Sequence, residues 1–151
     1  MVFGHSRMQN YPIRCTAGAF ILNSGLNKLN GEDEYLEHMF GMAVTAYPFL
    51  DAVGSTRFSK LFGSLEVLLG TLLLIPLIPD AAAGTVMLPF SAGLVGLYFR
   101  IPGMRAEKSL RPTSQGIAMA KDLWLLGISF SLVLSQVKSK MRNTGDLCQT
   151  R

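Results

Sequence analysis

Four long apolar runs restrict what this chain can fold into more than any other feature of its sequence. They cover residues 11–29, 58–78, 81–101 and 115–137, and each is close to the roughly 20 residues that a helix needs to cross a bilayer. Only 16% of the 151 residues are charged, against about 25% in a typical soluble domain. The sequence therefore predicts an all-α integral membrane four-helix bundle that forms a single domain.

The segments between these runs predict how the helices connect. Residues 31–57 begin acidic, then become apolar and contain Pro48, which favours an interfacial or re-entrant segment packed on the bundle between the first two helices. The connection at 79–80 is so short that the second and third helices must form an antiparallel hairpin. Residues 102–114 are polar and basic, as expected of a surface loop. Residues 138–151 form a polar tail that we expect to be poorly ordered.

Single charges inside the apolar runs point to a site. Glu66 interrupts the second run, and Lys121 and Asp122 interrupt the fourth. A charge within a membrane helix is costly and usually faces the bundle interior or a water-filled cavity, so it marks a functional site by default. Because alternate helices run in opposite directions, these charges fall in one leaflet with the ends of the first and third runs. The sequence therefore predicts a polar pocket built from Asn23, Glu66, Arg100, Lys121 and Asp122.

Helical spacing groups small and polar residues on particular faces. One stripe on the second run consists of Gly63, Glu66 and Gly70, and one on the third of Pro89, Gly93, Gly96 and Arg100. The small residues in each stripe let helices approach closely. Polar residues form a seam on the first run and one on the fourth: Thr16, Asn23 and Asn27, and Gln115, Asp122, Ser129 and Gln136. These faces are expected to be buried against neighbouring helices.

Two interpretations of the charges remain open. In the first, Glu66, Lys121 and Asp122 handle protons or a ligand, and the groups that contact a bound cofactor are Asn23, Arg100 and Trp124. In the second, Glu66 with Lys121, or Arg100 with Asp122, are ion pairs that only fix helix register. Trp124 then serves as a packing or interface anchor. In that interpretation the cations near the ends of the runs snorkel to the interface: Arg14, Lys28 and Arg100.

Several classes of protein are excluded by what the sequence lacks. Both histidines, His5 and His38, lie outside the apolar runs, which excludes a membrane haem held by histidine. Cys15 and Cys148 form no CxxC motif, and no metal-ligand, phosphate-loop or serine-nucleophile motif is present. The basic residues sit at the ends of the runs, unlike a nucleic-acid-binding stripe. The N-terminus also lacks the apolar core of a cleavable signal peptide.

The order of several short motifs resembles an actinobacterial-type DoxX-like protein over nearly the whole chain. These are Arg14, FILNSGLNKL, YPFL, Glu66 within LEVLLG, LYFRIPGMR and SLRPTSQGIAMAKDLWLLG. The resemblance implies a four-helix membrane bundle that acts as an accessory or quinone-interacting component of a respiratory or redox complex. It implies no covalently bound cofactor, and any enzyme activity would belong to the assembled oxidoreductase. The alternative is a non-enzymatic structural or transport protein, with homo-oligomerisation open in either case.

The charges flanking the runs give a weak indication of orientation. Arg7 and Arg14 flank the first run without nearby acids, whereas its far end is followed by an acidic cluster at 32–37. Lys and Arg are otherwise nearly balanced between the two sides, so the positive-inside rule alone does not decide. We expect a multi-pass protein of the cell membrane with both termini in the cytoplasm.

Overall fold

The computed structural model describes the backbone of residues 5–31, 33–106 and 108–149, and the side chains of 10–31, 34–106 and 108–135. This part of the chain is helical and contains no strand, which confirms the all-α class. Its elements are α1 (His5–Leu29), α2 (Asp33–Ala46), the 3₁₀ helix η1 (Pro48–Val53), α3 (Ser55–Leu74), α4 (Asp80–Arg100), α5 (Ile117–Ala120) and α6 (Asp122–Gln149).

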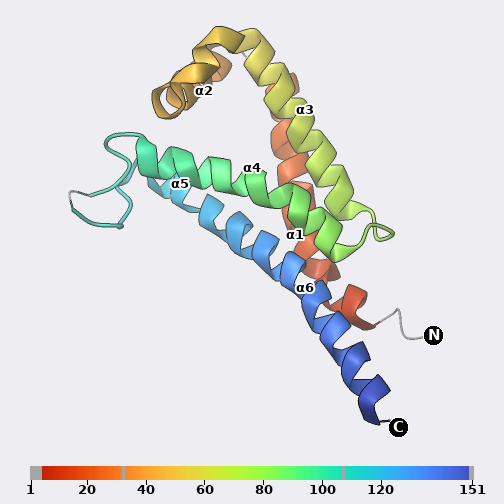
Figure 1. Cartoon of the computed structure of the whole chain (residues 1–151). Coiled ribbons are helices and arrows are strands. Elements are labelled where there is room, and N and C mark those ends of the chain that lie inside the picture. Colours follow the sequence, from red (N-terminus) through yellow and green to blue (C-terminus); the bar gives the residue numbers. More distant parts are fainter. Residues whose placement is uncertain (1–4, 32, 107, 150–151) are drawn as a thin grey trace.

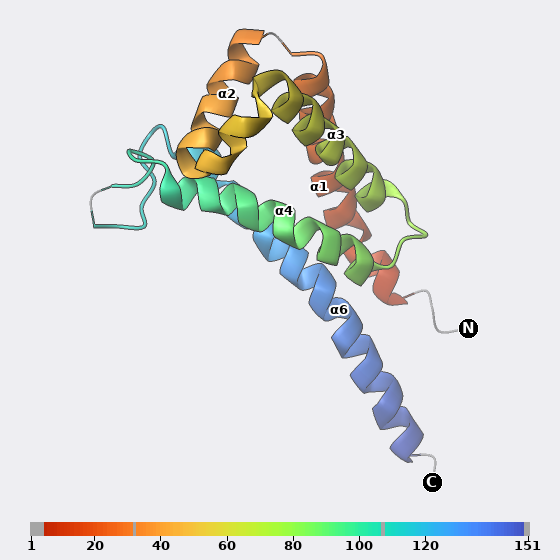
Figure 2. The same ribbon diagram turned by 45° about the horizontal axis from the view of Figure 1, so that its top comes forward.

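The four long helices are arranged as two pairs. Helix α1 packs along α3, and α4 packs along α6. The pairs join at the turn between α3 and α4 and diverge from it, and α2 lies across their open end (Figure 1). Figure 2 shows the same arrangement after rotation, with the start of α1 and the end of α6 at the same end of the molecule. The four long helices thus form two diverging pairs, and the expected four-helix bundle is not confirmed.

Glycines bring α1 and α3 into backbone contact. A Cβ atom at Gly25 would lie 2.7 Å from the Gly63 carbonyl oxygen, and one at Gly70 would lie 2.6 Å from the Leu22 nitrogen. No larger residue fits at either position unless the helices separate, because real Cβ contacts are longer than this. The predicted small-residue stripe on the second apolar run is therefore confirmed, and it sets the spacing of this pair.

The predicted stripe on the third run contacts Tyr47 rather than one of the long helices. Tyr47, between α2 and η1, packs against Gly96 and donates its hydroxyl hydrogen bond to the Gly93 carbonyl at 3.0 Å. The Arg100 guanidinium stacks 4.6 Å from the centroid of the same ring. Helix α4 instead meets α6 at Gly84, where a Cβ atom would lie 2.8 Å from Leu132 Cβ.

The segment between the first two long helices is ordered and packed, as expected. It forms α2 and η1, which contact α3 and α4. Pro48 begins the 3₁₀ helix, and Gly54 ends it at a φ of 78°, a conformation that glycine adopts at little cost. Its position at a membrane interface stays a prediction.

The backbone of residues 138–149, where the sequence predicted a polar tail, continues α6 as a helix. The fourth apolar run is also divided, since α5 ends at Ala120 and α6 begins at Asp122. Two segments of the described chain are long and apolar enough to cross a membrane, Asp80–Arg100 and Ile117–Ser135. This suggests a membrane protein, while α1 and α3 carry more charge and polar residues.

Candidate functional site

A cavity of about 520 Å³ lies between the two helix pairs, is partly open to the outside, and is lined on another side by α2 and η1. We call it the central cavity. Much of its wall is aromatic and apolar, with rings contributed by Phe20, Tyr35, Tyr47, Phe58, Phe62 and Phe90. Its polar and charged groups are few: Ser24, Lys28, Glu66 and Asp122. A mostly apolar cavity with a few converging polar groups is the usual form of a small-molecule site.

Glu66 is held in an ion pair with Lys28. The Lys28 Nζ atom donates to Glu66 Oε2 at 2.7 Å and to Ser24 Oγ at 2.6 Å, and both charged side chains are buried. Nζ also lies 5.5 Å from the centroid of the Phe62 ring. The suggested pair of Glu66 with Lys121 is therefore wrong, and so is a snorkelling Lys28. Glycines at the α1–α3 contact bring the two helices close enough for Lys28 to reach across.

Asp122 is the remaining charged group of the central cavity. It is the first residue of α6 and is half-buried, and among the described residues its carboxylate has no hydrogen-bond or ion-pair partner. The suggested pair of Asp122 with Arg100 is thus wrong. With Lys28 and Glu66 neutralising each other, Asp122 leaves the cavity one carboxylate in excess.

The other predicted site residues lie outside this cavity. Asn23, Lys121 and Trp124 have exposed side chains, and Trp124 is 73% exposed. Successive residues of a helix point about 100° apart, so Ser24 and Asp122 face inward while their neighbours Asn23 and Lys121 face outward. Arg100 is exposed and stacks against Tyr47 at the end of α4, and it does not line the central cavity. The structure therefore brings together only Glu66 and Asp122 of the predicted set.

The predicted polar seams divide in the same way. Ser129 is buried and its hydroxyl lies 3.1 Å from the Ser91 hydroxyl, which links α6 to α4. Asp122 is half-buried in the central cavity, and the other seam residues with described side chains are exposed: Gln115, Thr16, Asn23 and Asn27. The side chain of Gln136 lies outside the described part. The seam on the first run thus faces away from the neighbouring helices, contrary to expectation.

A second buried ion pair joins α1 to the turn between α3 and α4. Arg14 Nη1 donates to Asp80 Oδ1 at 2.8 Å, and Arg14 is only 2% exposed. The same guanidinium donates to the backbone carbonyls of Leu72, Leu73, Ile75 and Ile78. The interpretation in which Arg14 snorkels to the interface is therefore wrong, and its pairing with Asp80 was not predicted. The available signal was Asp80, an acid in a two-residue connection at the same membrane depth.

Comparison with known proteins gives no match to a family model, to a curated protein or to a solved structure. The resemblance to DoxX-like proteins accordingly remains a prediction from the sequence motifs. The site has to be interpreted from its own geometry, which combines an ammonium donor, a free carboxylate acceptor and aromatic walls.

Proposed function

We propose that this chain is a four-span membrane protein that binds a quinone-class ligand in the central cavity, as an accessory component of a membrane redox system. The observation that carries the proposal is the Asp122 carboxylate, which lines an aromatic cavity without a partner beside the buried Lys28–Glu66 pair. The motif resemblance to DoxX-like proteins supports the same class of function.

The cavity groups suit the two redox forms of such a ligand. A quinone head carries two carbonyl acceptors, and the Lys28 ammonium is a donor within the cavity. A quinol carries two hydroxyl donors, for which Asp122 is a free acceptor. The isoprenoid tail would lie along apolar walls such as Leu94 and Leu97. In this proposal the chain holds the ligand and its protons, and electrons pass to partner subunits of an oxidoreductase complex.

The two ion pairs support placement of α1 and α3 in the membrane as well. These helices are less apolar than α4, but Arg14 is neutralised by Asp80, and Lys28 and Glu66 neutralise each other. Charged residues within bilayers are tolerated when they are paired in the bundle interior. Four spans then follow, with both termini proposed to lie in the cytoplasm.

Cysteine labelling tests this topology directly. After Cys15 and Cys148 are replaced by serine, single cysteines at Leu77 and Asn143 should react with impermeant reagent from one side of the membrane. Cysteines at Glu34 and Leu110 should react from the other. Labelling of the Leu77 and Leu110 positions from the same side would refute the four-span arrangement.

A purely structural role is the second candidate, and the completeness of the ion pairs favours it. Each buried cation is paired with a buried carboxylate, which is what a register-fixing ion pair requires. Native purification with lipid extraction separates the two functions. Co-purifying quinone or oxidoreductase subunits support the redox proposal, whereas a ligand-free homo-oligomer supports the structural one.

A further inference from the structure

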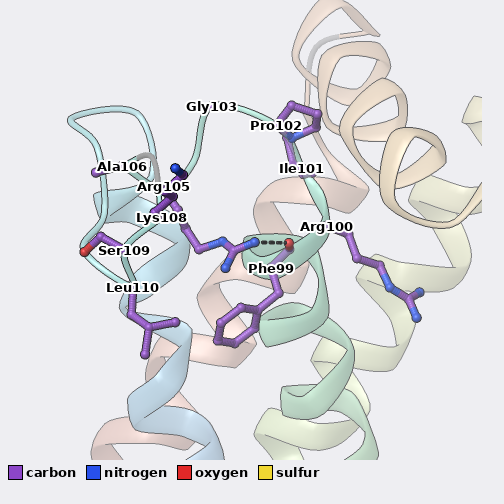
Figure 3. Close-up of a pocket in the computed structure, with 10 residues that line it drawn as sticks. All are labelled: Phe99, Arg100, Ile101, Pro102, Gly103, Arg105, Ala106, Lys108, Ser109 and Leu110. Carbon is purple, nitrogen blue, oxygen red and sulfur yellow. Dashed lines mark hydrogen bonds between the residues drawn. The ribbon is translucent and has the colours of Figure 1, made fainter.

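A second pocket of about 520 Å³ lies on the loop that follows α4, and it shares no lining residue with the central cavity. We call it the loop pocket (Figure 3). Arg105 and Lys108 contribute the cationic side chains that gather here, while the Arg100 side chain points away toward Tyr47. The sequence of the loop holds three cations, Arg105, Lys108 and Arg111, against one acid, Glu107, which lies outside the described residues. The loop around the pocket therefore carries a net positive charge.

The loop is held in this shape by its own hydrogen bonds. Arg105 Nη2 donates to the Phe99 carbonyl at 2.9 Å, and its guanidinium lies 5.1 Å from the centroid of the Phe99 ring. The Tyr98 hydroxyl donates to the Leu110 carbonyl at 2.7 Å. Lys108 adopts a φ of 53°, a left-handed conformation that a residue with a side chain rarely takes up. The Arg105 guanidinium is thus positioned before any ligand arrives, which lowers the entropy lost on binding.

Apolar side chains border the same pocket. Phe99 is 40% exposed and Leu110 is 72% exposed, and both line the loop pocket. The pocket also adjoins the end of α4, one of the two helices that are long and apolar enough to span a bilayer. A ligand here meets positive charge on one side and apolar surface on the other, at the level where a membrane helix ends.

We infer that the loop pocket binds the head group of an acidic phospholipid, whose phosphate meets Arg105 and Lys108 while its acyl chains lie against Phe99 and Leu110. Clusters of Lys and Arg beside membrane helices attract anionic head groups. With both termini in the cytoplasm, the loop after α4 lies on the opposite face of the membrane, so the lipid is one of the non-cytoplasmic leaflet. This inference rests on the membrane placement proposed above, but not on quinone binding.

Lipid selection by the purified protein tests it. Delipidated wild-type protein in detergent is mixed with equal amounts of phosphatidylglycerol and phosphatidylcholine, and the retained lipids are counted by native mass spectrometry. We expect retention of phosphatidylglycerol. Each basic residue near an anionic lipid surface contributes about fivefold to binding, so Arg105→Gln with Lys108→Gln should weaken retention on the order of 20-fold.

The matched control removes two exposed cations from the same side of the protein. Arg57→Gln with Lys60→Gln changes net charge equally at the start of α3, outside the loop pocket, and should retain wild-type selectivity. Equal loss in both double variants would overturn the site, as would no preference in the wild type. Displacement of the lipid by inorganic phosphate would instead identify a soluble anion as the ligand. Failure of all variants to insert into bilayer nanodiscs would contradict the membrane placement itself.

Discussion

Replacing Arg14 should expose a difference between the two buried ion pairs. Arg14 donates to the Asp80 carboxylate and to four backbone carbonyls around the end of α3. The last carbonyls of a helix have no partner within the helix and must be satisfied from outside. Arg14 therefore terminates α3 as well as neutralising Asp80, which a simple ion pair does not do.

The expected cost follows from these contacts. Arg14→Met strands the buried Asp80 carboxylate, at about 3 to 5 kcal/mol. It also leaves the carbonyl of buried Leu73 without its donor, at about 1 to 3 kcal/mol. The carbonyl of Ile75, an exposed residue, is free to rehydrate and adds little. We expect the free energy of unfolding to fall by about 4 to 8 kcal/mol, a large fraction of the stability of most domains.

The double variants separate the two contributions. Arg14→Met with Asp80→Ala removes the stranded charge but not the stranded carbonyl, so about 1 to 3 kcal/mol of destabilisation should remain. Lys28→Met with Glu66→Leu strands no backbone group, because Lys28 donates only to Ser24 and Glu66, and should stay within about 1 kcal/mol of wild type.

Equilibrium unfolding in mixed micelles, followed by circular dichroism, measures these differences. A variant with Arg14→Lys provides the control for charge, since lysine keeps the cation but loses the planar donor fork. It should fall between wild type and Arg14→Met. If the double variant Arg14→Met with Asp80→Ala proves as stable as wild type, the carbonyl contacts contribute nothing and the reasoning fails.

Three further predictions concern the helix contact and the central cavity. Gly25→Ala should separate α1 from α3 and destabilise the protein by about 1 to 3 kcal/mol. The control Gly41→Ala, whose Cβ meets nothing within 4 Å, should be neutral or slightly stabilising. Thermal unfolding of the two variants measures the difference. Glu66→Gln should leave the protein inserted, since the amide keeps the side-chain shape, yet impair the redox or proton-linked phenotype. Wild-type function in this variant would favour a purely structural role for the ion pair. Asp122→Asn should give the same phenotype with unchanged thermal stability, because the carboxylate has no protein partner to lose.

Periodic features of the sequence predicted the fold well. The second and third apolar runs located α3 and α4 to within four residues at each end, whereas α1 begins six residues before the first run and α6 continues twelve residues beyond the fourth. The spacing of Gly63 and Gly70 identified the face that meets α1. Such patterns are local, and they depend only on the rise and rotation of a helix. The pairing of the helices was not predictable in this way, because it depends on which glycines face each other across the molecule.

The site was predicted only in part for the same reason. Glu66 and Asp122 were identified because a charge in an apolar run is unusual wherever it points. The ion-pair partners could not be predicted without distances. Lys28 of α1 reaches Glu66 of α3 where glycines bring the helices together, and Arg14 of α1 reaches Asp80 at the start of α4. Lys121 was misplaced since one residue along a helix reverses whether a side chain faces inward or outward.

Ligand binding by the central cavity tests the main claim most directly. Calorimetric titration of the purified protein with a short-chain quinol should show saturable binding. Asp122→Leu should weaken it by about 10- to 100-fold, the equivalent of a lost hydrogen bond to a charged group. The control Glu37→Gln, which removes an exposed acid of α2 outside the cavity, should bind as wild type does. Absence of saturable binding to the wild-type protein, or undiminished binding to Asp122→Leu, would contradict the proposed function.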